Sequence, residues 1–174
     1  PCLMISLRRA ASCLKIDSVR CSIQLIFTAL FIALTASSQN DREAVVKVLN
    51  TYKSKIEKLD TTGVASLFLP GARVFEGGKD EGGIKGYLDH HLTPELKNFK
   101  SFTYSDYELD VKLNGNYAYT IETYIYTIVL EKDASEIKSR GVATSVLRKI
   151  KNEWKIEMTH GSYRKINAVT IQKK

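Results

Sequence analysis

The chain has few cysteines, and all three lie within its first 21 residues: Cys2, Cys13 and Cys21. The rest of the 174-residue chain cannot form a disulfide, so a domain built from it must be stabilised by core packing. The first 38 residues also differ in character from the remainder of the chain. A basic lead-in precedes an uninterrupted apolar run, Ile23 to Ala36, and small residues follow at Ala36-Ser37-Ser38.

This leader predicts a secretory signal peptide over residues 1–38, cleaved near Ser38-Gln39. We therefore expect a secreted or periplasmic protein with no membrane segment after cleavage. The apolar run is shorter than the roughly 20 residues that span a bilayer. Residues 39–174 would then form a single domain, which is long enough to bury on the order of two thirds of its unfolded surface.

A large excess of charge of one sign is also missing. Residues 39–174 hold 22 Lys and Arg against 18 Asp and Glu, a net charge of +4. The basic residues are scattered among acids and form no stripe, so we expect no nucleic-acid binding.

The first half of this domain has helical periodicity. Asn40 to Glu43 resembles a capping box, which predicts that a helix begins there. Apolar residues then recur at steps of three and four and predict one buried face: Val45, Val48, Leu49, Tyr52, Ile56 and Leu59. A short strand, Ala72 to Glu76, and a glycine-rich loop, Gly77 to Gly86, lead to a second helical stretch around Tyr87.

From Ser101 onward the apolar period changes to two. Four long strands are predicted, with an Asn114-Gly115 hairpin turn after the first: Phe102 to Leu113, Tyr117 to Leu130, Ile137 to Ile150 and Trp154 to Lys165. Helices followed by a run of strands predict an α+β fold, in which a curved antiparallel sheet wraps around the N-terminal helices.

Histidine is scarce, and its positions suggest a site. His91 shares a helical stripe with Tyr87 and Leu88, so we expect it to face the interior and His90 to lie at the rim. In the last strand, an apolar set alternates with polar residues and is expected to face inward: Trp154, Ile156, Met158, His160 and Ser162.

Two carboxylates could join these histidines. Glu76 ends the short strand, and Glu122 shares one face of Tyr117 to Leu130 with Tyr124 and Tyr126. Both faces of that strand are rich in aromatic residues, so periodicity leaves open which face points inward. A buried Glu122 would need a donor nearby.

Two stretches, KLDTTGVASLFLPGARVFEGG and GVATSVLRKIKNEWKIEMTHGS, resemble the SnoaL-like families of the nuclear transport factor two superfamily. The resemblance covers about Asp41 to Lys165. It lies in the order and spacing of a few short patterns: Asp60, Leu67-Phe68, Pro70-Gly71-Ala72, Trp154-Lys155-Ile156 and His160-Gly161-Ser162.

This resemblance implies a cone, or cystatin-like α+β roll, whose interior binds a small apolar or aromatic molecule. It also implies a homodimer formed through the sheet. The superfamily includes ketosteroid isomerase, scytalone dehydratase, limonene epoxide hydrolase and polyketide cyclases, so the fold does not name a reaction. The Asp base and the Tyr/Asp pair of ketosteroid isomerase cannot be placed in this sequence.

Three functions remain open from the residues. The first is a binding module without a cofactor, whose pocket we expect to be lined by Tyr and His: Tyr87, His91, Glu76, Tyr124, Tyr126, Trp154, Met158 and His160. The second is a cofactor-free isomerase, dehydratase or hydrolase that uses His160, His91 and Glu122 in acid–base catalysis. The third is a divalent-metal site formed by His91, His160 and Glu76.

Overall fold

The computed structural model describes residues 38–166. The chain divides into two units, Pro1–Asn40 and Asp41–Lys174, and the second contains the sheet and the hydrophobic core. Apart from Ser38, the predicted leader lies outside the described residues, so the signal peptide remains a prediction. Within residues 38–166, no helix is both long enough and apolar enough to cross a membrane.

The N-terminal helix runs over residues 38–57 and buries the predicted face, including Val45, Leu49 and Ile56. Its predicted start at Asn40 is wrong, because residues 38–40 are already helical. Asp41 has a different role. Its Oδ1 accepts hydrogen bonds from Lys149 Nζ at 2.6 Å and from Trp154 Nε1 at 3.1 Å, which attach the helix to the sheet. The bond from Lys149 lowers the pKa of Asp41.

Short elements connect this helix to the long strands. They are the 3₁₀ turn η1 (Val64–Leu67), strands β1 (Phe68–Glu76) and β2 (Lys79–Gly83), helix α2 (Ile84–Tyr87), the π-helical turn η2 (Leu88–Leu92) and helix α3 (Thr93–Leu96). The prediction of a loop from Gly77 to Gly86 is wrong. Gly77 and Gly78 both have positive φ and make a tight turn, which lets β2 pair with β1 as an edge strand.

The four long predicted strands are confirmed as β3 (Phe99–Asn114), β4 (Tyr117–Leu130), β5 (Glu136–Ile150) and β6 (Glu153–Lys165). They form a six-stranded sheet in the order β2-β1-β6-β5-β4-β3. The sheet is curved and does not close. It is mixed and not purely antiparallel as expected, because β1 pairs with β6 in parallel.

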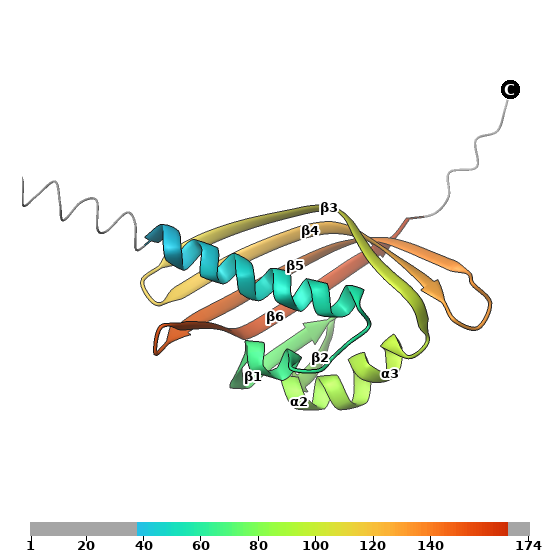
Figure 1. The fold of residues 1–174 in the computed structure, drawn as a ribbon, viewed down its shortest axis with the longest axis horizontal. Coiled ribbons are helices and arrows are strands. Elements are labelled where there is room, and N and C mark those ends of the chain that lie inside the picture. Colours follow the sequence, from blue (N-terminus) through green and yellow to red (C-terminus); the bar gives the residue numbers. More distant parts are fainter. Residues whose placement is uncertain (1–37, 167–174) are drawn as a thin grey trace, which may run out of the picture. The chain divides into compact units, whose positions relative to one another are not determined.

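The N-terminal helix crosses one face of the sheet, here called the inner face (Figure 1). The core lies between them and includes the fully buried Leu49, Leu147 and Ile156. The α+β class and the helix-covered curved sheet are therefore confirmed. The inner face is where any internal site must lie.

A β-bulge divides β6 into two parts. The side chains that point to the inner face are the even-numbered ones before the bulge and the odd-numbered ones after it. Leu147 of β5 pairs with Ile156, and the preceding Val146 pairs with Met158, so Glu157 has no opposite residue. One extra residue turns every later side chain to the other face. Trp154 and Ile156 are buried, whereas between Glu157 and Ser162 the exposed positions are Met158, His160 and Ser162.

Candidate functional site

Within residues 38–166, the one acidic residue that is buried as a whole lies on the inner face of β4. Ala118, Thr120 and Glu122 are buried on this face, and the alternate residues Tyr119 and Ile121 are exposed. The structure thus decides the orientation that periodicity left open. Glu122 is 9% exposed, and Tyr124 follows it on the same face.

A small cavity lies beside Glu122, between the N-terminal helix and the sheet. Its volume is about 40 Å³. That is room for about three water molecules, at roughly 10–15 Å³ each, and is well below the few hundred Å³ of a site that encloses a whole ligand. The lining is rich in hydroxyl groups: Tyr52, Lys53, Tyr104, Tyr107, Glu122, Tyr124, Ala143, Ser145 and Thr159.

The Glu122 carboxylate accepts a hydrogen bond from the Tyr107 hydroxyl, with an O–O distance of 2.6 Å. Burial raises the pKa of Glu122, and the bond from Tyr107 and the charge of Lys53 oppose that rise. Burial also raises the pKa of Tyr107 and Tyr124. The group is therefore a buried carboxyl whose pKa is raised, surrounded by neutral hydroxyl donors.

A second bulge brings Tyr107 into this site. The pairing of β3 with β4 shifts between Ser105 and Glu108, and Asp106 has a φ of 50°. Without the bulge, two residues three apart would point to opposite faces of the sheet. With it, Tyr104 and Tyr107 both line the cavity, and their rings lie 6.5 Å apart.

Lys53 is the one basic residue in the cavity lining. Its Nζ lies 5.2 Å from the ring centre of Tyr107 and 5.6 Å from that of Tyr104. It also pairs with Glu57 one helical turn further on, at 3.3 Å. The ammonium thus lies over two tyrosine rings, a geometry that favours a cation.

His91 belongs to a neighbouring cluster at the β1 end of the inner face. Its Nε2 lies 3.4 Å from Glu76 Oε2 and 3.7 Å from Glu95 Oε1, and its side chain is 27% exposed. The Tyr87 ring stacks on the imidazole, with the centres 5.2 Å apart. The Tyr87 hydroxyl donates to Glu76 at 2.8 Å. His91 is partly exposed, and His90 is exposed.

Tyr52 connects the two groups. Its ring lines the cavity, and its hydroxyl makes a hydrogen bond with Tyr87, which itself bonds Glu76. Burial raises the pKa of Tyr52, and the nearby Glu76 raises it further. Tyr52 therefore lies between the cavity and the cluster of Tyr87, Glu76 and His91.

His160 does not join this site. It is exposed on the outer face of the sheet, where it pairs with Thr144 on β5 and Phe75 on β1. The expected inward orientation of His160 and Met158 is wrong, because the bulge at Glu157 lies between them and Ile156. In their place Thr159 lines the cavity and bonds Ser145 at 2.9 Å.

Trp154 is inward as predicted, but it belongs to the helix–sheet core and not to the cavity lining. Tyr126 also lies on the inner face, next to Tyr124, with ring centres 6.4 Å apart. Of the predicted ligand-binding residues, only Tyr124 lines the cavity itself; Tyr87, His91 and Glu76 form the neighbouring cluster.

Residues 45–165 match the family described as the SnoaL-like domain. The chain belongs to the SnoaL-like domain family. No curated protein matches the sequence. Proteins of this family and superfamily commonly bind small molecules, include isomerases and dehydratases, and are generally free of cofactors.

Solved structures resemble this SnoaL-like domain over most of their length. A nuclear transport factor 2-like superfamily protein from Salmonella enterica has a TM-score of 0.64 at 19% identity, covering 79% of this chain and 99% of the other. The hexachlorocyclohexane dehydrochlorinase LinA-type3 from Novosphingobium barchaimii has a TM-score of 0.61 at 15% identity, covering 78% and 96%.

A candidate ketosteroid isomerase from Shewanella frigidimarina is 26% identical to the SnoaL-like domain. Its TM-score is 0.58, and the match covers 68% of this chain and 94% of the other. The Salmonella and Novosphingobium proteins are less similar in sequence, at 19% and 15% identity, and therefore show the fold alone.

Within residues 38–166 of the SnoaL-like domain, no group of three or more His, Cys, Asp or Glu side chains is placed to hold a metal ion. The proposed ligands His91 and Glu76 do lie together, but His160 is on the other face of the sheet. The metal site predicted from those three residues is therefore not assembled by this fold.

Several residues of the site were missed from the sequence of this SnoaL-like domain. Tyr52 had a signal, since it lies on the apolar stripe of the N-terminal helix. No sequence pattern marked Lys53 or Tyr107 as a site residue. Lys53 lies beside the apolar stripe, and Tyr107 follows Tyr104 by three residues; both placements are typical of exposed positions. Glu81 and Glu95, which approach His91 at 3.9 and 3.7 Å, were not marked by any pattern either.

Proposed function

We propose that this protein binds a small aromatic molecule. The polar group of the ligand enters the cavity, where it is anchored by Glu122. The buried Glu122 carboxyl is the observation that carries this proposal. A carboxyl in a residue that is 9% exposed is costly in a protein interior, and the cavity beside it has room for a ligand group. The tyrosine rings around it supply flat apolar contacts for the rest of the ligand.

The size of the cavity supports insertion of one functional group over enclosure of a whole molecule. The surrounding donors and the carboxyl suit a ligand hydroxyl or carbonyl, because each such group can be paired there. A ligand that lacks the polar group would leave Glu122 without that partner.

Phenolic ligands test this proposal. Wild-type protein is titrated with p-cresol and with toluene, which has the same ring and methyl group but no hydroxyl, and binding is followed by NMR chemical shifts. We expect p-cresol to bind at least about tenfold more tightly, which corresponds to about 1.4 kcal/mol. Glu122→Leu should lower this ratio severalfold, because the p-cresol hydroxyl then loses the carboxyl that anchors it.

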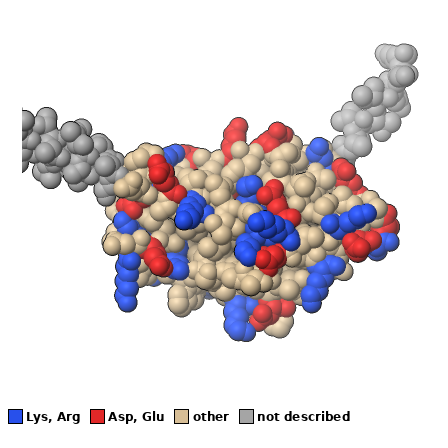
Figure 2. Space-filling model, viewed as in Figure 1, with Lys and Arg blue, Asp and Glu red and all other residues tan. Residues whose placement is uncertain are grey.

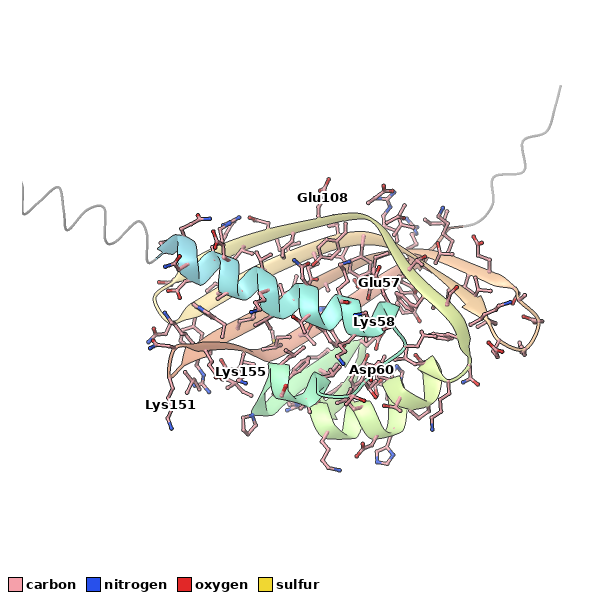
Figure 3. All side chains as sticks on the ribbon, viewed as in Figure 1. Glu57, Lys58, Asp60, Glu108, Lys151 and Lys155 are labelled. Atoms are coloured by element: carbon pink, nitrogen blue, oxygen red, sulfur yellow. The ribbon has the colours of Figure 1, made fainter. Side chains whose placement is uncertain are left out.

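The matched control is Glu108→Gln, which alters a carboxylate on β3 that points away from the helix (Figure 3). It should preserve the wild-type ratio. Equal affinities of the wild type for the two ligands would contradict the proposal.

A second candidate function is acid–base catalysis at the same place. The raised pKa of Glu122 favours it, because a buried carboxyl whose pKa is shifted toward neutrality can donate or accept a proton at neutral pH. Catalysis would then be lost in Glu122→Gln, which keeps the shape and hydrogen-bonding capacity of the side chain but cannot transfer a proton. Binding alone would survive that change.

We also propose a homodimer formed through the outer face of the sheet. Exposed apolar side chains occupy neighbouring strands there: Tyr119 and Ile121 on β4, Val142 on β5 and Met158 on β6. Cross-strand pairing joins Tyr119 through Val146 to Met158, so the patch is continuous.

Charged residues flank this patch, with Glu108, Asp110 and Lys112 on β3 and Arg140 and Arg164 on β5 and β6. A two-fold related copy can set the two β3 carboxylates of one protomer against the two arginines of the other. By contrast, acidic and basic groups are interspersed on the face shown in Figure 2.

Mass measurement by light scattering checks the dimer. The wild type should have twice the mass of one chain, and Ile121→Glu should be monomeric, because two carboxylates would be buried in the interface. Lys151→Glu, at the β5–β6 turn (Figure 3), places a carboxylate away from the patch, with an even larger change in charge, and should stay dimeric. A monomeric wild type would rule out this interface.

A further inference from the structure

Gly141 lies in the middle of β5 and faces the cavity side of the sheet. It pairs with Tyr124 on β4 and with Tyr163 on β6, and it is buried. A glycine in a strand interior has no side chain to pack, and it often marks a place where another group approaches the backbone closely.

At Gly141 the approaching group is the Tyr124 ring. A Cβ added at Gly141 would lie 2.2 Å from Tyr124 Cε2, 2.7 Å from Cζ and 2.9 Å from Cδ2. Contacts this short do not occur, so any side chain at position 141 must displace the ring. The ring therefore rests directly on the backbone of β5.

The direction of that displacement is limited by the neighbours of Tyr124. Its ring meets Tyr104 edge to face at 5.0 Å and lies nearly parallel to Tyr107 at 6.4 Å. Both neighbours line the same cavity, and Tyr107 holds Glu122. With the backbone of β5 behind it, a displaced Tyr124 ring has to move toward the cavity or press on the tyrosine that orients Glu122.

We propose that Gly141 is a specificity-determining residue of the cavity, because its missing Cβ lets Tyr124 lie against β5 and so sets the width of the opening beside Glu122. The inference rests on the proposed function, and it narrows the ligand class. A flat aromatic ring whose polar group enters the cavity can stack on the tyrosine rings beside it, whereas a branched or puckered molecule cannot lie flat against them.

Gly141→Ala tests the role, and Gly161→Ala is the matched control. Gly161 is the nearby glycine of β6, and a Cβ there would meet no atom within 4 Å. Alanine for glycine at an unstrained strand position is otherwise neutral or stabilising, since it restricts the unfolded chain. We expect Gly141→Ala to lower the affinity for p-cresol at least tenfold and to lower the urea midpoint of unfolding. Gly161→Ala should leave the affinity within threefold and the midpoint unchanged or higher.

The double variant Gly141→Ala/Tyr124→Ala tests whether the clash with the Tyr124 ring is what destabilises Gly141→Ala. Removing the ring should remove the clash, so the double variant should have a higher urea midpoint than expected from adding the two single changes. This also holds if Gly141→Ala alone does not fold, because the double variant should then fold. The inference is overturned if the double variant shows no such recovery, or if Gly141→Ala behaves as Gly161→Ala does.

The urea midpoints need no ligand, so the two proposals fail differently. A wild type that binds p-cresol no better than toluene contradicts the proposed function. If the shift of the urea midpoint in the double variant equals the sum of the shifts in the two single variants, the proposed role of Gly141 is contradicted, whether or not p-cresol binds.

Discussion

Trp154→Ala is expected to lower the free energy of unfolding by about 3–5 kcal/mol, the usual cost of removing a buried tryptophan. The indole is 4% exposed and lies in the core between the N-terminal helix and the sheet. The change also removes the donor that binds Asp41 Oδ1. Urea unfolding followed by far-ultraviolet circular dichroism measures the loss, because Trp154 is the single tryptophan and the variant has no tryptophan fluorescence.

Two further variants divide this effect. Trp154→Phe keeps most of the apolar volume but cannot donate to Asp41, so it should recover part of the loss. Tyr163→Ala removes an aromatic ring that is 58% exposed and should change stability by less than about 1 kcal/mol. If Trp154→Ala were no less stable to urea than Tyr163→Ala, the helix–sheet core around Trp154 would contribute little to stability.

Deletion of Glu157 is expected to cost more than about 3 kcal/mol of unfolding free energy, or to prevent folding. Without the extra residue, either Trp154 and Ile156 turn outward, or Thr159 turns away from the cavity and His160 turns into it. Each alternative exposes core side chains or buries unpaired polar ones. Urea unfolding again measures the change.

Glu157→Ala is the matched substitution. It keeps the residue count, and therefore the bulge, and removes only a 3.2 Å ion pair with Arg148 between partly exposed side chains. Such pairs contribute about 0–1 kcal/mol. If deletion of Glu157 lowered the unfolding free energy no more than Glu157→Ala does, the bulge would not determine which side chains of β6 point to the inner face.

The long strands and the amphipathic helix were predictable because each repeats its pattern many times. Val45, Leu49 and Ile56 lie on one helical stripe, and all three are buried. Burial alternates in β4 from Tyr117 to Glu122 as a period of two requires. The parallel pairing of β1 with β6 was not predictable, since these strands are far apart in sequence and no local pattern records which strands become neighbours.

Bulges limited the prediction of the site. A single inserted residue has no compositional mark in the sequence, yet it reverses every side chain that comes after it. Glu157 sends His160 outward, and the bulge near Asp106 brings Tyr107 inward. Glu122 and Tyr124 were predicted as site residues and do lie together on the inner face, since no bulge interrupts the pairing of β4 with β5.

The parallel β1–β6 pair also constrains how the chain acquires its fold during synthesis. β1 lies between β2 and β6, so one of its two neighbours is the last of the six strands in chain order. Until residues 153–165 leave the ribosome, β1 and β2 can form only an isolated hairpin with a free edge, which is marginally stable in water. Assembly of the whole sheet therefore waits for the synthesis of β6, and a chain cut short before β6 would present that free edge for pairing with other chains.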